Sequence, residues 1–305
     1  MRWRRAISVA VAITIVAATL VTIRLWPREP LAERIASSTA IFDRHGRLLR
    51  LTLASDHQYR LWIPLEDISP ELIEALLLHE DQHFYLHPGF NVASLIRAAV
   101  SSYSGGPRVG GSTITMQLAR LMYGLNTRTI SGKLEQIVRA IQLELCYSKR
   151  DLLEAHLNLM PYGGNIQGVG AASLIYFDKS AKRLGLSEAL TLVLIPQSPA
   201  RRAPSLDEPA DLRDARLRLF ARWVERHPDA ASAAEYVATP LHYASLRDLP
   251  FAAPHFTNTI LQRSRPASVH SVNTTLDLRS QRTLERIVAT YVREHGNIGI
   301  HNAAA

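Results

Sequence analysis

The hydrophobic and polar positions of this 305-residue chain change their spacing twice. Residues 6–23 form an uncharged apolar run of 18 residues, about the length at which a helix spans a bilayer. Residues 39–63 are rich in β-forming residues with a turn at Asp43–Gly46, which predicts a short β hairpin. After Pro64, apolar positions recur at helical spacing. Helices are expected from 70 to about 80–83 and at about 91–103, 113–124, 130–147, 149–160, 168–176 and 187–196.

Two of these helices have clear start signals. Ser69 precedes Pro70 and Glu71, which gives an N-cap, a proline at the first helical position and an acidic residue in the first turn. Ser148 and Asp151 form a capping box. Helix follows helix through short connections, and no alternation of strands and helices is visible. The predicted fold class is therefore mainly α, with the β hairpin before the first of these helices.

The residues around the apolar run predict its orientation. Arg2, Arg4 and Arg5 precede it, and Trp3 stands where a membrane interface would begin. The positive-inside rule then places the N-terminus in the cytoplasm and the chain after Arg24 on the far side of the membrane. A cleaved signal peptide is the alternative, but its apolar core would be unusually long, and no clear A-x-A site follows. We therefore expect an uncleaved signal anchor.

Composition narrows the function. The chain has a net charge of +8, and only four of its 35 Lys and Arg residues are lysine. Arginine forms forked hydrogen bonds to phosphate and carboxylate oxygens. A basic chain rich in arginine therefore suits binding to nucleic acid, to an anionic membrane surface or to a phosphorylated substrate. The single Cys146 excludes an internal disulfide. From about residue 204 we expect a Pro/Asp/Ala-rich stretch, one or two amphipathic helices, an extended connector, and a final strand and helix.

Residues 79–83 (HEDQH) match the helical zinc-protease motif H-E-x-x-H. Catalytic zinc needs three protein ligands and a water, and the metzincin continuation would require Gly at 86 and His at 89, where the chain has Leu86 and Gly89. No Asp or Glu occurs from Gln82 to Leu134 to supply another ligand nearby. The zinc interpretation is therefore disfavoured, and Glu80 becomes the candidate for a base that acts without a metal.

The acid-free stretch is itself informative. Its charged residues are all basic, namely Arg97, Arg108, Arg120, Arg128 and Lys133. A glycine-rich segment at 105–111 runs into a helix expected to begin near Ser112, and such a junction binds anions through free backbone N–H groups. Gly111 occupies the position of the P-loop lysine, so nucleotide binding is disfavoured and another phosphate is favoured. A plain surface loop is the alternative interpretation.

Five segments resemble, in order and spacing, the five motifs of glycosyltransferase family 51. They are EDQHFYLHPG, GGSTITMQLAR, SGKLEQ, EAHLNLMPYGGNIQGVGAA and IPQSPA. This family is the peptidoglycan glycosyltransferase domain of class A penicillin-binding proteins, and its C-type branch is the most similar. The resemblance covers roughly residues 40–220. It implies a lysozyme-like, two-lobed helical fold that is anchored in the bacterial inner membrane, faces the periplasm and uses lipid II as substrate.

By this resemblance Glu80 is the catalytic base. It would take the proton from the 4-hydroxyl of the acceptor N-acetylglucosamine, which attacks C1 of the donor N-acetylmuramic acid with inversion and releases undecaprenyl pyrophosphate. The residues assigned to the substrate or to support of the site are Asp81, Phe84, His87, Ser112, Thr113, Gln117, Arg120, Arg128 and Lys133. The residues of the fourth and fifth motifs for which a structural role is expected are Glu154, Asn158, Pro196, Gln197 and Pro199.

Three positions depart from the family pattern. The usual R-K-x-x-E of the third motif reads Gly132-Lys133-x-x-Gln136, and Met116 replaces the first Gln of the second motif. Gln136 therefore stands at the catalytic position of the family's second carboxylate, where it can hydrogen-bond but binds a divalent ion less strongly and cannot act as an acid. We expect no metal site and no required cofactor, although Mg²⁺ or Mn²⁺ could accompany the substrate pyrophosphate.

The expected organisation is a cytoplasmic tip and transmembrane anchor at 1–24, a stalk at 25–38, and the glycosyltransferase domain at 39–227. Residues 228–305 would hold a linker and the start of a transpeptidase region, without its S-x-x-K and K-T-G motifs. The expected partners are lipid II, the growing glycan chain and the inner membrane. Other cell-wall synthesis proteins are possible further partners, and no binding to nucleic acid is expected. Such a chain would polymerise glycan without cross-linking it. The alternative is a catalytically weak scaffold that binds lipid II.

Overall fold

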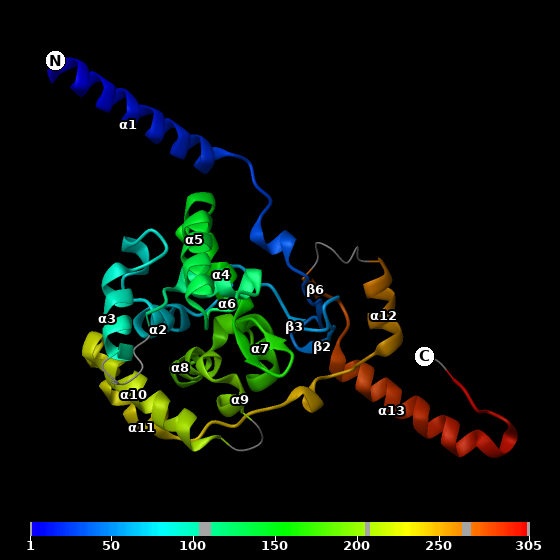
Figure 1. The fold of residues 1–305 in the computed structure, drawn as a ribbon. Coiled ribbons are helices and arrows are strands. Elements are labelled where there is room, and N and C mark those ends of the chain that lie inside the picture. Colours follow the sequence, from blue (N-terminus) through cyan, green and yellow to red (C-terminus); the bar gives the residue numbers. More distant parts are fainter. Residues whose placement is uncertain (1, 104–110, 205–207, 264–269, 304–305) are drawn as a thin grey trace.

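A computed structural model describes residues 2–103, 111–204, 208–263 and 270–303 of the protein (Figure 1). Helices dominate it, and the helices predicted between residues 70 and 196 all form with ends within a few residues of those expected. They are α2 (Pro70–Glu80), α3 (Val92–Tyr103), α4 (Ile114–Tyr123), α5 (Ile130–Cys146), α6 (Lys149–Leu159), α7 (Val169–Phe177) and α8 (Leu186–Leu194). The predicted mainly α fold is therefore confirmed.

The predicted start signals act as expected. The Ser69 hydroxyl accepts the backbone N–H of Leu72 at the start of α2, and Pro70 occupies the first turn. Ser148 and Asp151 form the capping box of α6. After α8 the chain continues through a 3₁₀ turn, η5 (Ile195–Gln197), and three further helices. These are α9 (Pro199–Arg202), α10 (Ala210–Arg226) and α11 (Ala234–Ala238).

The predicted hairpin is present but has an additional strand. Strands β1 (Ala40–Phe42) and β2 (Leu48–Leu51) pair antiparallel across the expected turn. Strand β6 (Ser271–Asn273) then joins β1 in parallel, although about 230 residues separate them in the chain. A second small sheet orders its strands β3 (Tyr59–Arg60), β5 (Ile166–Gln167) and β4 (Pro161–Gly163).

The C-terminal stretch forms a strand and a helix, as predicted, and it packs on the hairpin. The predicted strand and helix are β6 and α13 (Leu278–His295), and a further helix that was not predicted, α12 (Pro254–Arg263), precedes β6. Leu278 is buried together with Ile41 and Leu49 in a small apolar cluster. The sequence indicated no core for this region, and the physical reason is that its core is shared with residues near the other end of the chain.

One large apolar core holds the helical body together. Leu72 and Leu76 of α2, Leu118 of α4, Leu153 of α6 and Leu190 of α8 are each fully or almost fully buried in it. Burying one leucine side chain contributes roughly 1.5–3 kcal/mol. Helix α2 packs against both α8 and α10. This packing fixes the C-terminal end of α2, where Glu80 lies.

The N-terminal helix α1 (Arg2–Leu25) extends away from this body in Figure 1. Its last turn is attached to α5, because one Arg24 guanidinium nitrogen donates to the carbonyl groups of Glu144 and Tyr147, each at 2.8 Å. Among the described residues, no helix combines the length and the apolar character that a bilayer crossing requires.

Candidate active site

The Glu80 carboxylate lies at the C-terminal end of α2 between two side-chain amides. Gln117 of α4 donates its Nε2 hydrogen to Oε2 of Glu80 at 2.8 Å. Gln197 of η5 donates to Oε1 at 3.1 Å. The side chain of Glu80 is 14% exposed, so it is largely enclosed but remains open to the surface. Elements from three parts of the chain therefore converge on one carboxylate.

The H-E-x-x-H segment does not form the helical arrangement that zinc proteases use. Helix α2 ends at Glu80, so His79 and His83 do not lie on successive turns of one helix. His83 is exposed, whereas His79 Nε2 lies 2.6 Å from the amide nitrogen of Gln197. Because that amide nitrogen can only donate, His79 Nε2 is the acceptor of a neutral imidazole. Burial lowers the pKa of His79, which agrees with this state.

Asp81 connects the loop after α2 to the start of α4. Its Oδ2 accepts the backbone N–H of Ile114 at 3.1 Å and the Nε2 hydrogen of His87 at 2.9 Å. The other nitrogen of His87, Nδ1, accepts the N–H of Gly89. Thr113 caps α4 and also donates its hydroxyl to the carbonyl of Gly89 at 2.6 Å. Asp81, His87 and Thr113 thus hold the loop and the helix in one fixed arrangement.

Phe84 supports this loop from inside. Its side chain is fully buried, with Lys149 Nζ 4.4 Å from the centre of its ring. The Lys149 ammonium also donates to the carbonyl of His87 at 2.8 Å. Gly89 has a φ of +95°, and a Cβ there would lie 2.9 Å from Glu144 Cγ, so only glycine fits this close approach. Phe84 therefore acts through packing, and it offers no surface to a substrate in this arrangement.

Two of the predicted cationic residues, Lys133 and Arg120, lie close enough to interact. Lys133 Nζ donates to the hydroxyl of Ser112 at 2.7 Å and to Oε1 of Gln136 at 2.8 Å. Partial burial, and secondarily the positive charge of Arg120, lower the pKa of Lys133. Arg120 and Arg128 are exposed, and neither side chain makes a hydrogen bond or ion pair within the described part of the chain. The glycine-rich segment up to residue 110, with its arginine at 108, lies outside the described residues.

The three residues that depart from the family pattern are all accommodated by their surroundings in the structure. Gln136 is almost fully buried, and its Nε2 donates to the backbone carbonyl of Met116 at 2.6 Å. The Met116 side chain is itself buried in the core. A side chain at Gly132 would collide with the carbonyl oxygen of Asn126. The loop before α5 therefore occupies the space that a larger residue would need at Gly132.

The fourth-motif residues have contacts that fit the structural role expected for them. Glu154 accepts the indole N–H of Trp62 at 3.0 Å and the backbone N–H of Leu65 at 2.9 Å. Asn158 accepts from the N–H of Ile63 and donates to its carbonyl. Both side chains fasten the segment after β3 to α6.

Two residues near Glu80 were not assigned to the site from the sequence. Gln197 was expected to be structural, yet it contacts the carboxylate directly. His156 of α6 is 1% exposed, and its two ring nitrogens have no hydrogen-bond partner among the described residues. Burial lowers the pKa of His156 to about 4, and the charges of Glu80, Arg120 and Asp81 also act on it. A lone histidine on an amphipathic helix gives no sequence signal for such a position.

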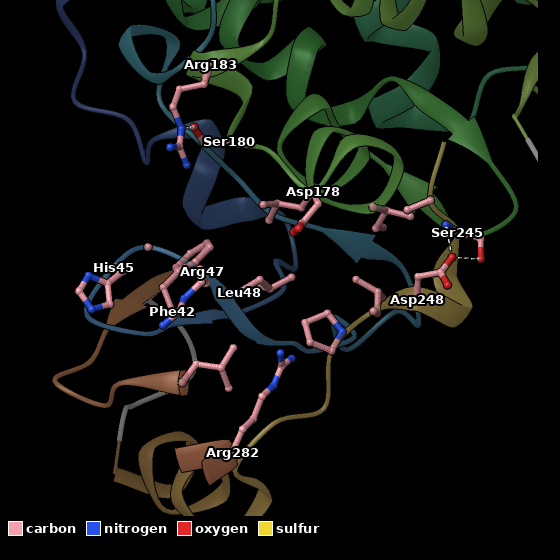
Figure 2. A pocket seen from close by; sticks show the side chains of 17 residues that line it. Phe42, His45, Arg47, Leu48, Asp178, Ser180, Arg183, Ser245, Asp248 and Arg282 are labelled. Atoms are coloured by element: carbon pink, nitrogen blue, oxygen red, sulfur yellow. Dashed lines mark hydrogen bonds between the residues drawn. The ribbon is translucent and has the colours of Figure 1, made fainter. Parts of the chain in front are cut away.

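A separate cavity of about 480 Å³ lies between the hairpin, the end of α7 and the C-terminal segment (Figure 2). None of the predicted site residues lines it. Arg47 on its wall donates to Asp43 at 2.7 Å, and His45 lies 2.9 Å from Asp277. Because it contains none of the predicted site residues, this cavity is not the site of the chemistry expected at Glu80.

Penicillin-binding proteins are similar to this chain over most of its length. Over 270 residues the chain is 37% identical to penicillin-binding protein 1C of Escherichia coli, which covers 88% of this chain and 34% of that protein. It is 30% identical to penicillin-binding protein 2D of Bacillus subtilis, covering 95% of this chain and 44% of the relative. The chain thus spans less than half the length of these relatives.

A solved structure, penicillin-binding protein 1A from Haemophilus influenzae, matches 86% of this chain and 30% of its own, with 18% identity and a TM-score of 0.38. A protein-family model also matches this chain. The transglycosylase family model covers residues 45–223, a range that contains every residue assigned above to the site. The chain belongs to the transglycosylase family of penicillin-binding proteins.

Proposed function

We propose that this chain is a peptidoglycan glycosyltransferase that polymerises lipid II into β-1,4-linked glycan and releases undecaprenyl pyrophosphate. The observation that carries the proposal is the geometry of Glu80 within a transglycosylase domain. Its carboxylate is held by Gln117 and Gln197, while Lys133 and Arg120 supply positive charge on the neighbouring helices. A fixed base next to cations suits a reaction in which an alcohol attacks as a diphosphate leaves.

Glu80 and the cationic residues have different roles in the proposed reaction. Each oxygen of Glu80 accepts one amide hydrogen bond, and each retains a lone pair for the acceptor hydroxyl. Glu80 takes the proton as the hydroxyl oxygen attacks C1 of the donor sugar, and the C1–O bond breaks with its electron pair passing to the pyrophosphate. Lys133, Arg120 and Arg128 would stabilise that developing charge. Base catalysis by a positioned carboxylate contributes typically about 10²- to 10⁴-fold.

Gln136 and its neighbours do not form a suitable ligand set for a protein-bound divalent cation. Gln136 is 1% exposed, its nitrogen donates to Met116, and its oxygen accepts from Lys133. A cation at this point would meet the Lys133 ammonium instead of a free carboxylate. Any Mg²⁺ or Mn²⁺ would therefore be held by the substrate pyrophosphate, and the steps above use only the protein's own groups.

We also propose the cellular arrangement that the sequence predicts. The apolar residues 6–23 would anchor the chain in the inner membrane as a single span, with the glycosyltransferase domain at 39–227 in the periplasm in a lysozyme-like, two-lobed arrangement. This proposal rests on the sequence of that segment and on the arginines before it. Deleting residues 6–23 should move the protein from the alkali-resistant membrane fraction to the soluble fraction, and unchanged fractionation would contradict it.

Polymerisation of labelled lipid II by the wild type and by Glu80→Gln tests the function. We expect long glycan strands from the wild type and at least about 10²-fold less from Glu80→Gln, which retains the side-chain volume but cannot accept the proton. The second candidate, a scaffold that binds lipid II, is favoured by the amide at Gln136. It would be supported if both proteins bound lipid II equally and neither produced polymer.

A further inference from the structure

In the described part of the chain, Gln197 is the only residue of the fifth motif that forms a hydrogen bond with Glu80. Its amide nitrogen lies 3.1 Å from Glu80 Oε1 and 2.6 Å from His79 Nε2. Its amide oxygen accepts from Nη1 of Arg202 at 3.0 Å. One amide therefore connects the end of α2 with α9.

The direction of this amide is fixed by Arg202. A guanidinium has only donors, so it requires the Gln197 oxygen on its side. The amide nitrogen must then face Glu80 and His79. Rotating the amide by 180° would place its oxygen against the Glu80 carboxylate and its nitrogen against the guanidinium, and both contacts would be repulsive. The orientation thus follows from the chemistry of the neighbours and not from the amide alone.

Arg202 is itself held in place. The nitrogen that contacts Gln197 also donates to the carbonyl of Leu194 at the end of α8, at 2.9 Å. Its Nε lies 3.6 Å from Asp211 of α10. The Arg202 side chain is 15% exposed, whereas that of the adjacent Arg201 is 74% exposed and contacts Asp211 without reaching Gln197. The two consecutive arginines therefore differ in the one contact that matters here.

We propose that Gln197 and Arg202 are positioning residues for the catalytic base, with Arg202 acting through Gln197. This inference rests on the proposed function of Glu80. Gln197 holds one carboxylate oxygen so that the lone pair that remains points at the acceptor hydroxyl. The proposed pyrophosphate contacts Lys133, Arg120 and Arg128 lie on other parts of the chain, so Gln197 and Arg202 should affect the reacting step more than substrate binding.

The test compares Gln197→Met, Arg202→Met and the double variant in steady-state polymerisation of lipid II, with Arg201→Met as the matched control. We expect kcat to fall about 10- to 100-fold in each single variant, because a misplaced catalytic group costs up to about 100-fold. KM should stay within about twofold. The double variant should be no slower than the slower single variant, since Arg202 acts through Gln197. Arg202→Lys should restore part of kcat, and Arg201→Met should match the wild type.

Several outcomes would overturn the inference. Unchanged kcat in Gln197→Met would do so, and that variant should fold because Gln197 lies on the surface. A double variant whose losses multiply would show that Arg202 acts by itself through the fold. If the wild type produces polymer and Glu80→Gln does not, the proposed function stands whatever these variants do. If the wild type produces none, the proposed function fails and this inference fails with it.

Discussion

Because the imidazole of His156 is buried, we expect the free energy of unfolding to decrease as the pH falls from about 6.5 to about 4. His156 is 1% exposed, and both of its ring nitrogens are unpaired within the described structure. Burial is the main cause that lowers its pKa from 6.5 to about 4, and the charge of Arg120 lowers it further. The negative charges of Glu80 and Asp81 act in the opposite direction and are outweighed.

The sign and size of the effect follow from these two pKa values. Above about pH 6.5, His156 is neutral in both the folded and the unfolded chain, so it causes no pH dependence. As the pH falls from 6.5 to 4, the unfolded chain binds a proton that the folded chain does not, and the free energy of unfolding decreases. A gap of about 2.5 pKa units at about 1.4 kcal/mol per unit limits the loss to roughly 3 kcal/mol.

Urea unfolding of the wild type and His156→Leu at pH 7.5 and 4.5 measures this term, with the fluorescence of the buried Trp62 and Trp223 as the signal. Other titrating groups are the same in both proteins, so the difference between them isolates His156. At pH 7.5 we expect the variant to be at least as stable, because it lacks two unpaired polar atoms. At pH 4.5 its advantage should grow by about 2–3 kcal/mol. A difference that stays constant within about 0.5 kcal/mol would refute the reasoning, since it would mean that the folded protein binds the proton.

Three further substitutions test the packing around the site. Gly132→Ala should destabilise the protein by about 1–3 kcal/mol, because its Cβ would collide with the Asn126 carbonyl; an unchanged thermal midpoint would contradict this. Gln136→Glu introduces the family's usual carboxylate beside Lys133, but it removes the donor to a backbone carbonyl and should lower the free energy of unfolding by about 1–3 kcal/mol. Greater stability in urea would show that the ion pair dominates. Arg216→Met leaves the buried Glu208 without its charge partner and should cost about 3–5 kcal/mol, measured by urea unfolding at pH 7.5; a cost below about 1 kcal/mol would show that Glu208 is solvated or protonated.

The sequence was sufficient for features that depend on local signals. The helices between residues 70 and 196 have their own caps and apolar periodicity, as Ser69 and Ser148 illustrate, so their positions could be predicted. The hairpin turn at Asp43–Gly46 is also a local signal. The pairing of β6 with β1 could not be predicted, because a three-residue strand carries almost no information about a partner about 230 residues away.

The candidate site shows the same limit. Motif spacing made Glu80 the candidate base, but the contact between Gln197 and Glu80 depends on how η5 and α2 pack in three dimensions. The burial of Phe84 could not be read from its motif either, since an aromatic residue beside a catalytic group fits both packing and ligand contact. The position of His156 against the site arises only when α6 packs on α4.

Helix α4 connects the proposed base, Glu80, to Arg120 and Lys133. Gln117 and Arg120 are three residues apart and therefore lie on neighbouring positions of one helical surface, about 4.5 Å apart along its axis. Gln117 holds Glu80, and Arg120 acts on Lys133. The start of the same helix is bound by Asp81, the residue next to Glu80. Since Glu80 and Asp81, at the end of α2, are bound to two turns of α4, the distance between the proposed proton acceptor and the positive charge is set before any substrate arrives. A reaction that needs a sugar carbon held between the two would then require little rearrangement of the protein.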